Sequence, residues 1–253
     1  MTETLSLRAK IEQSPMGAYQ WMIVVMAAIM NLLDGFDVLA LAFTATAIRG
    51  EFGLTGIELG YLLSAGLFGM TAGSLFLAPL ADKIGRRPLL LMAVSLSAIG
   101  MLGSAFISQY QWLGFWRVIT GLGVGGILVG TNVITSEYSS RKWRSFAISV
   151  YAAGFGIGAV LGGMFAVMLQ GEYGWRSVFL AGAILTGLLL VVLFIWLPES
   201  IDFLTSKQPK NAEVRLNLIA KKIGLAGDWK LPAKVEKVKS KLPISQLFSE
   251  KYL

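Results

Sequence analysis

The sequence predicts an all-α membrane protein built on six transmembrane helices. Of its 253 residues, 55% are hydrophobic and only 15% are charged. The mean hydropathy of +0.66 is too high for a soluble domain. Six apolar runs are each long enough to cross a hydrocarbon layer of ~30 Å, which takes ~20 helical residues. These runs are 19–47, 57–80, 88–107, 112–135, 146–169 and 178–197.

Basic residues give the predicted topology. Six spans place both chain ends on the same side of the membrane. On that side the N-terminal segment and the connections carry eight Lys and Arg, against two on the other side. The positive-inside rule therefore places both termini in the cytoplasm. The eight are Arg8, Lys10, Lys83, Arg86, Arg87, Arg141, Lys142 and Arg144, and the two are Arg49 and Arg176.

The spans divide the chain into three predicted parts. These are a cytoplasmic N-terminus (1–18), a six-helix transmembrane bundle (19–197) and a basic cytoplasmic stretch (198–253). Within the basic stretch, residues 212–223 have Val214 and Leu218 at helical spacing, with Leu216 and Ile219 nearby, which indicates a short amphipathic helix. A partly ordered, solvated tail is the alternative.

Composition excludes several classes of function. Without cysteine, the chain has no disulfide, thiolate metal site or cysteine nucleophile. The net charge of +7 does not indicate nucleic-acid binding, because 11 of the 22 Lys and Arg lie beyond Leu197 and most others lie in short connections. The sequence contains no recognisable metal cluster or nucleophile–base pair, so we expect no enzyme, no metal and no cofactor. Because histidine is absent, any proton carried at neutral pH must use carboxylates.

Two aspartates interrupt the first apolar run. Asp34 and Asp37 are three residues apart, so on a helix they share a face, with Asn31 one turn earlier. They lie ~14 to 20 Å from the outer end of the run at 1.5 Å per residue, which is mid-membrane. Carboxylates at that depth are costly, and they normally mark a proton or substrate route. The alternative is a hydrogen-bonded pair that only fixes helix packing.

Arg117 is the expected counter-charge. It lies in the fourth run, ~8 to 9 Å from the outer end. An arginine at this depth can reach Asp37 if the two helices are adjacent. Two roles stay open for it, as a structural partner of the aspartates or as the cation that receives an anionic substrate.

Glycines recur at four-residue steps in the later runs. Gly121 and Gly125 form one such pair, and Gly154 and Gly158 form another. Small residues at this spacing let helix backbones approach closely. We therefore expect a dense bundle.

Several motifs resemble those of the major facilitator superfamily. Residues 82–87 (DKIGRR) occupy a turn between the second and third runs, where Gly85 can supply a positive φ. They match the superfamily loop motif G-x-L-A-D-[RK]-x-G-R-[RK], with Ala78 in place of its first glycine. Residues 117–126 (RVITGLGVGG) resemble the helix-4 motif R-x-x-x-G-x-G-x-G-G, and residues 198–200 (PES) the sequence that commonly closes helix 6.

Residues 34–37 (DGFD) point to a subfamily. They resemble the D-G-x-D signature of aromatic acid:proton symporters, which import benzoate-, hydroxybenzoate-, muconate- or phenylpropionate-type acids in bacteria. Residues 158–163 match the helix-5 motif of drug antiporters except that Ala159 replaces its proline, which favours a symporter. The resemblance implies proton coupling and substrate passage at Asn31, Asp34, Asp37 and Arg117. It implies a cytoplasmic gate at Asp82, Gly85, Arg86, Arg87, Glu137 and Arg144.

The resemblance also implies a missing part. Such transporters have two six-helix halves, each a 3+3 repeat, with the substrate site between them. We expect this chain to be the N-terminal half in a bacterial inner membrane, with residues 243–253 as the approach to a seventh helix. The expected partners are the lipid bilayer, a small organic acid and a C-terminal half. The alternatives are a superfamily transporter for a sugar, another metabolite or a drug, and a self-sufficient six-helix protein acting as a homodimer.

Overall fold

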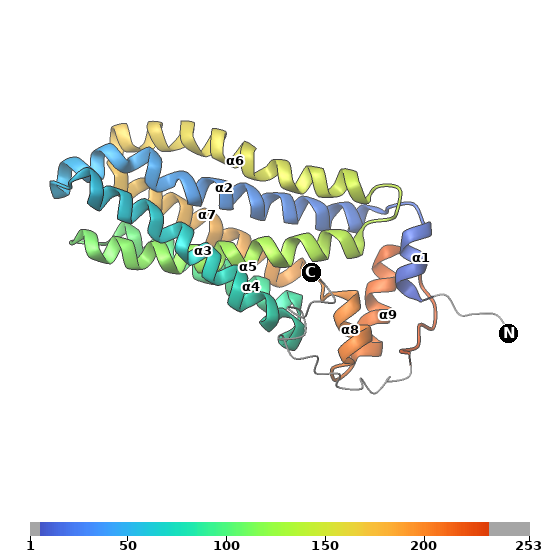
Figure 1. Cartoon of the computed structure of the whole chain (residues 1–253). Helices are drawn as coiled ribbons and strands as arrows, with labels where there is room; N and C mark the ends of the chain where they lie inside the picture. Colours follow the sequence, from blue (N-terminus) through green and yellow to red (C-terminus); the bar gives the residue numbers. More distant parts are fainter. Residues whose placement is uncertain (1–5, 233–253) are drawn as a thin grey trace, which may run out of the picture.

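The computed structural model describes residues 6–232, and these are helical apart from short connections. Figure 1 shows long helices running side by side and short helices gathered at one end. The predicted approach to a seventh helix, 243–253, lies outside the described residues. The helices are α1 (Leu7–Gln13), α2 (Ala18–Phe52), α3 (Gly56–Ile84), α4 (Arg86–Ala105), α5 (Tyr110–Tyr138), α6 (Arg144–Tyr173), α7 (Trp175–Trp196), α8 (Ile201–Lys207) and α9 (Ala212–Ile223).

The six predicted spans are confirmed as α2 to α7. Each of these helices has the length and the apolar composition needed to cross a membrane. Most of them extend a few residues past the predicted ends, because local hydrogen bonds continue them. At the start of α3, for example, the Thr55 hydroxyl accepts from the Glu58 amide, and the Glu58 carboxylate accepts from the Thr55 amide. Only α4 and α7 end before the predicted residue, at Ala105 and Trp196.

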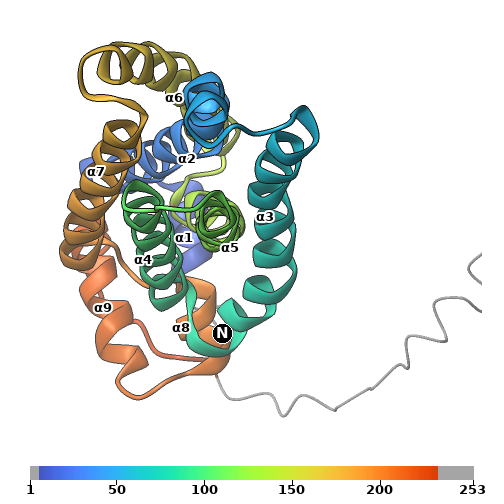
Figure 2. The same cartoon turned by 90° about the vertical axis from the view of Figure 1, so that its left-hand side faces the viewer.

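The helices α2 and α5 form the centre of the bundle. α3 packs along α5, α6 packs along α2, and α4 packs on both α5 and α7. Figure 2 shows α7 and α3 on opposite sides of α4 and α5. Large apolar side chains point outward from α3, α6 and α7, and Phe68, Val160 and Phe194 are 69%, 66% and 65% exposed. Such an apolar exterior suits contact with lipid.

Glycines bring two helix pairs into backbone contact, as their spacing predicts. A Cβ added at Gly154 or Gly158 of α6 would collide with backbone carbonyls of α2. A Cβ added at Gly121 or Gly125 of α5 would collide with backbone carbonyls of α3. Small residues permit this approach, and the pairs α2–α6 and α3–α5 are dense as a result.

The short helices α1, α8 and α9, here called the short-helix cluster, lie together at one end of the bundle (Figure 1). α9 has the predicted bounds, so the solvated-tail alternative is wrong for these residues. Its buried apolar side chains include Leu216 and Ile219, whereas Val214 and Leu218 are 60% and 56% exposed. The predicted helix is therefore correct, but the two residues placed first on its apolar face point outward.

The sequence does not predict α1 and α8. Each has seven residues, too few to show a clear hydrophobic period. Both begin at a serine whose hydroxyl accepts a backbone N–H. Ser6 accepts from Ala9, and Ser200 accepts from Phe203. Local capping thus starts both helices, and tertiary packing buries their apolar residues.

Ion pairs fasten α1 to its neighbours. The Glu12 carboxylate accepts a hydrogen bond of 2.6 Å from Arg144 at the start of α6. Arg8 pairs with Asp202 of α8. The hydrogen bond from Arg144, together with the charges of Arg144, Arg8 and Arg141, holds the pKa of Glu12 below its ordinary value of 4.5. Glu12 and Arg8 therefore connect α1 to α6 and to α8.

Candidate functional site

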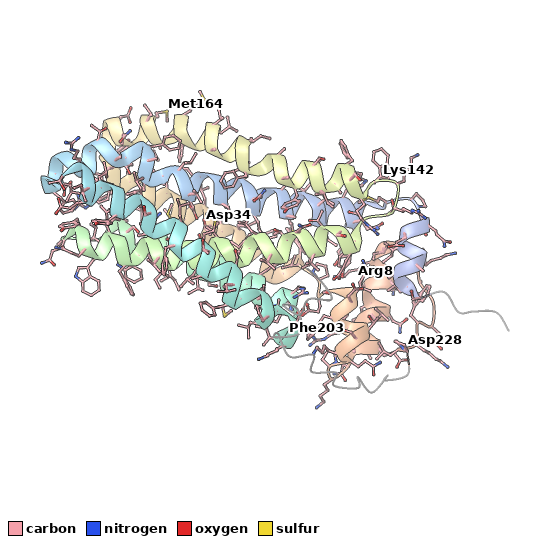
Figure 3. The ribbon with its side chains drawn as sticks, in the orientation of Figure 1. Arg8, Asp34, Lys142, Met164, Phe203 and Asp228 are labelled. Carbon is pink, nitrogen blue, oxygen red and sulfur yellow. The ribbon has the colours of Figure 1, made fainter. Side chains whose placement is uncertain are left out.

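Asn31, Asp34 and Asp37 lie near the middle of the 35-residue helix α2. Their exposed fractions are 3%, 1% and 2%. Figure 3 places Asp34 midway along the bundle, far from both ends. The three polar side chains are buried inside the bundle, where their position in the first apolar run predicts them.

Gly35 sets the rotation of this segment against α6. A Cβ at this position would fall on the carbonyl oxygen of Phe155. Only glycine lets the two backbones meet here. Because the glycine edge of α2 is pressed on α6, the carboxylate of Asp37 lies on the side of α2 that packs toward α4 and α5.

Asn31 connects α2 to α6. Its Nδ2 donates to the carbonyl oxygens of Tyr151 and Ala152, at 2.8 and 3.4 Å. Its Oδ1 is buried without a hydrogen-bond partner among residues 6–232. The contacts of Asn31 are those of a residue that fixes helix packing.

The two aspartates have different surroundings. The Oδ2 of Asp37 accepts a hydrogen bond of 2.6 Å from the Ser97 hydroxyl of α4. Its Oδ1 has no partner in the described part of the chain, and neither has Oδ2 of Asp34. Both acids therefore have fewer donors than a buried carboxylate can use.

Arg117 of α5 lies close to Asp37 but forms no ion pair with it. Its guanidinium donates to the Ser104 hydroxyl at 2.8 Å, to the Met101 sulfur at 3.1 Å and to the backbone oxygen of Asp37 at 3.5 Å. Its carbon Cζ lies 4.8 Å from the centre of the Phe179 ring. Across residues 6–232, no ion pair within 4.0 Å joins Arg117 to either aspartate. The direct counter-ion contact expected from the sequence is therefore replaced by contacts with α4 and α7.

Asp37 and Arg117 meet at one pocket between α2, α3 and α5. Its volume is ≈ 160 Å³. Apolar side chains form most of its walls, including Leu39, Leu41, Leu62, Leu63, Leu67 and Val124. An apolar pocket with one cation and one acid can hold a small amphipathic anion and exchange a proton near it. The pocket contains no metal-ligand cluster, since no group of three or more His, Cys, Asp or Glu with suitable geometry occurs in the described residues.

The predicted turn between α3 and α4 is organised by Glu199. Its Oε1 accepts from the backbone amides of Arg86 and Arg87, at 2.8 and 3.0 Å, and so binds the exposed N–H groups at the start of α4. Gly85 has a φ of 105°, and a Cβ there would lie 2.5 Å from Oε2 of Glu199. The positive φ predicted for Gly85 is confirmed, and the same glycine makes room for the carboxylate.

The six predicted gate residues fall into separate groups. Asp82 pairs with Arg86 at 2.8 Å. Both line a pocket of ≈ 350 Å³ that Glu137 also lines. Arg87 instead donates to the Phe194 carbonyl of α7 at 2.7 Å, and Arg144 pairs with Glu12 of α1. The structure therefore brings Asp82, Arg86 and Glu137 together and leaves Arg144 elsewhere.

Glu137 closes the start of α8. Its carboxylate accepts from the Ser200 hydroxyl at 2.7 Å and from the Ile201 amide at 2.9 Å. It is 3% exposed. Among the predicted gate residues, Glu137 therefore has a structural role, because it connects the end of α5 to the start of α8.

Comparison with known proteins defines the family. The sequence profile described as Major Facilitator Superfamily matches residues 27–253. The chain belongs to the major facilitator superfamily. It is therefore a multi-pass membrane protein of a transporter family, and not an enzyme.

The relatives within the superfamily include bacterial transporters of aromatic acids. The chain is 34% identical to the gallate transporter of Pseudomonas putida over 96% of its own length and 54% of the relative. It is 34% identical to the 4-hydroxybenzoate transporter PcaK of Pseudomonas putida over 85% of its own length and 48% of the relative. It thus spans about half the length of the curated relatives it matches.

A solved transporter structure also matches this chain over about half of its own length. The proton:xylose symporter XylE, bound to 6-bromo-6-deoxy-D-glucose, aligns with a TM-score of 0.73 and 22% identity. The alignment covers 83% of this chain and 50% of that one. The fold is thus the six-helix N-terminal half of the superfamily fold.

Three contacts of the candidate site are not predicted from the sequence. Ser97, Met101 and Ser104 of α4 contact Asp37 or Arg117. Serines are common in transmembrane helices, and their partners lie on other helices. The one available signal is spacing, since positions four and seven residues after Ser97 share its helix face. Glu199 was noted only as part of a closing motif, although it organises the start of α4.

Proposed function

We propose that this chain is the N-terminal half of a proton-coupled importer of aromatic carboxylic acids. The pocket that joins Asp37 and Arg117 carries the proposal. A carboxylate can bind the buried guanidinium, while an aromatic ring fits among the leucines of α2 and α3. The aromatic acids named for the relatives support the same class of substrate.

In this proposal the acids and the arginine have separate roles. Arg117 receives the carboxylate of the substrate, because it is the cation at the pocket. Asp37 lines the pocket, and Asp34 lies about one turn earlier in α2. These two carboxylates carry the proton. The absence of histidine supports this assignment, since carboxylates are then the groups left to titrate near neutrality.

The proposal includes a location and an organisation. The chain lies in a bacterial inner membrane with both termini in the cytoplasm, as the eight-to-two distribution of basic residues supports. The short-helix cluster then lies on the cytoplasmic side, and residues 198–253 connect the bundle to a C-terminal half. Asp82, Gly85, Arg86, Arg87, Glu137 and Arg144 control access from the cytoplasm.

An uptake experiment tests the proposal. The chain is co-expressed with the C-terminal half of the gallate transporter of Pseudomonas putida, and uptake of labelled 4-hydroxybenzoate, gallate and xylose is measured under an imposed proton gradient. We expect uptake of the acids, its loss in Asp34→Asn and Asp37→Asn, and normal uptake in Glu172→Gln, a control at an exposed carboxylate. Preference for xylose would favour a sugar transporter. Uptake by the chain without a C-terminal half would favour a self-sufficient homodimer.

A further inference from the structure

We infer that Ser97 and Ser104 of α4 are positioning residues that hold Asp37 and Arg117 apart, so that each charge is free for its task. The inference rests on the proposed function, because it concerns the same pocket. Neither serine lines that pocket. Both therefore act through the charged side chains, and neither touches the substrate.

The contacts of the two serines are directional. The Ser97 hydroxyl donates to Oδ2 of Asp37 at 2.6 Å. The Ser104 hydroxyl donates to the Gly100 carbonyl at 2.7 Å, which turns its lone pairs toward Arg117, and it accepts from Nη2 of Arg117 at 2.8 Å. The two serines are fully buried. One helix face thus supplies a donor to the acid and an acceptor to the cation.

The packing of α4 on α5 makes this face a fixed support. A Cβ at Gly100 would collide with Thr120 of α5, and a Cβ at Gly123 of α5 would lie 2.7 Å from the Ser97 amide. The backbones of α4 and α5 are therefore in close contact. The stretch of α4 that carries the two serines is held in place against α5.

The separation leaves buried hydrogen-bonding capacity on both charges. Oδ1 of Asp37 and Nε of Arg117 are buried without a partner in the part of the chain that the structure describes. A direct ion pair between the two groups would fill that capacity, because unlike charges attract strongly in a medium of low dielectric constant. Such a pair would also compete with a substrate carboxylate for Arg117. Holding the charges apart keeps the arginine open to the substrate.

Two other titratable groups lie near this region. Asp34 lies on the same helix as Asp37, and Tyr151 of α6 lies within reach of the charge of Asp34. From α3, the pocket receives only Leu62, Leu63, Gly66 and Leu67. From α7, a Cβ added at Gly182 would lie 3.4 Å from Oδ1 of Asp37. Among the described residues, the two α4 serines supply the hydroxyl groups that hydrogen-bond to the Asp37 carboxylate and to the Arg117 guanidinium.

Kinetics of uptake in the assembled transporter tests Ser104. Loss of its hydroxyl lets Arg117 turn to Asp37, so we expect Ser104→Ala to raise KM for 4-hydroxybenzoate about tenfold with little change in maximal rate. Ser104→Thr keeps the hydroxyl and should restore KM. Ser95→Ala is the matched control, because Ser95 lies on the same helix and donates only to the Leu91 carbonyl. Equal KM values in Ser104→Ala and Ser95→Ala would overturn the role of Ser104.

The coupling of uptake to protons tests Ser97. We expect Ser97→Ala to lower proton-driven accumulation about tenfold, while exchange of internal for external substrate without a gradient changes less than about twofold. A purely structural serine would lower both rates together. That result would overturn the role of Ser97.

A measurement on the chain alone separates this inference from the proposed function. In lipid nanodiscs, the infrared carboxyl band of Asp37 is assigned as the band that Asp37→Asn removes. It should shift in Ser97→Ala and Ser104→Ala and stay in place in Ser95→Ala. If the assembled transporter takes up no aromatic acid while the band shifts, the proposed function fails and the serine contacts stand. An unshifted band in both serine variants would overturn the inference whatever the transport result.

Discussion

The buried carboxylates of the described residues occupy two places, and the two places differ in how many donors reach them. Asp34 and Asp37, the mid-membrane pair, are 1% and 2% exposed, and Glu137 and Glu199, the connection pair, are 3% and 7% exposed. Their burial is alike, but the connection pair accepts more hydrogen bonds than the mid-membrane pair. Glu199 accepts from three backbone amides, and Asp37 accepts from one hydroxyl.

Under the proposed function, the difference separates structural carboxylates from those that act in transport. A carboxylate that accepts several backbone N–H groups stabilises the folded state and has less capacity left for a ligand. A carboxylate that is buried with few donors costs stability, and proteins keep such groups where function requires them. Four substitutions can break or sharpen this distinction.

The largest effect is expected for Asp37→Asn. Proton-driven uptake by the assembled transporter should fall about 100-fold or more, because the amide cannot carry the proton. The free energy of unfolding of the chain should stay level or rise, since a poorly satisfied buried acid is removed. Uptake assays and unfolding in mixed detergent micelles measure the two effects. A large loss of stability would place Asp37 with the structural acids.

Glu199→Ala should have the opposite profile. It leaves the first two amides of α4 and the Ser200 amide without their acceptor, so we expect a loss of about 2 to 3 kcal/mol in the free energy of unfolding. Asp82→Ala is the control in the same turn, because its side chain is 66% exposed and its ion pair with Arg86 is worth little. If both variants unfold alike, the number of donors does not explain stability in this connection.

Gly85→Ala tests the room that Glu199 needs. The added methyl group meets the carboxylate and strains a φ of 105°, so we expect a loss of about 1 to 3 kcal/mol in the free energy of unfolding. Gly53→Ala is the matched control. Gly53 also has a positive φ, of 63°, but nothing lies within 4 Å of its added Cβ. The difference between the two losses isolates the contact with Glu199, and equal losses would exclude it.

The smallest effect is expected for Glu12→Gln. The Glu12 side chain is 33% exposed, unlike the four buried carboxylates. Because Arg144 lowers the pKa of Glu12, the pair stabilises the fold above pH 4.5, and this stabilisation is lost as the pH falls through the lowered pKa. Glu12→Gln should therefore lower the melting temperature slightly at pH 7 and not at strongly acidic pH. High salt should reduce the difference. A difference that persists in acid would point to packing of α1 and not to charge.

Sequence reasoning reached the features that depend on local pattern. The spans follow from apolar length, the turn at Gly85 from its glycine, and α9 from its period. It also located Asp34, Asp37 and Arg117 inside apolar runs. Each of these signals lies within a single stretch of chain.

It failed where a side chain selects its partner across the fold. The family resemblance groups Arg144 with Glu137 as gate residues, whereas the structure pairs Arg144 with Glu12 on a helix too short to predict. Ser97 is 60 residues from Asp37 in the sequence. A single sequence does not encode which of several serines meets a given aspartate. That choice depends on how α2 packs on α6 and how α4 packs on α5, and Gly35 and Gly100 permit these two close approaches.

Gly35 therefore matters for how mutations in this segment should be interpreted. It meets neither proton nor substrate in the proposed mechanism, yet it presses α2 onto Phe155 and so determines where Asp34 and Asp37 lie. A genetic screen for lost growth on an aromatic acid would score all three positions alike. Loss of a carboxylate would explain the hits at Asp34 and Asp37. The hit at Gly35 would come only from displacement of α2 against α6. No second-site change of a side chain can compensate at Gly35, because the obstacle there is backbone.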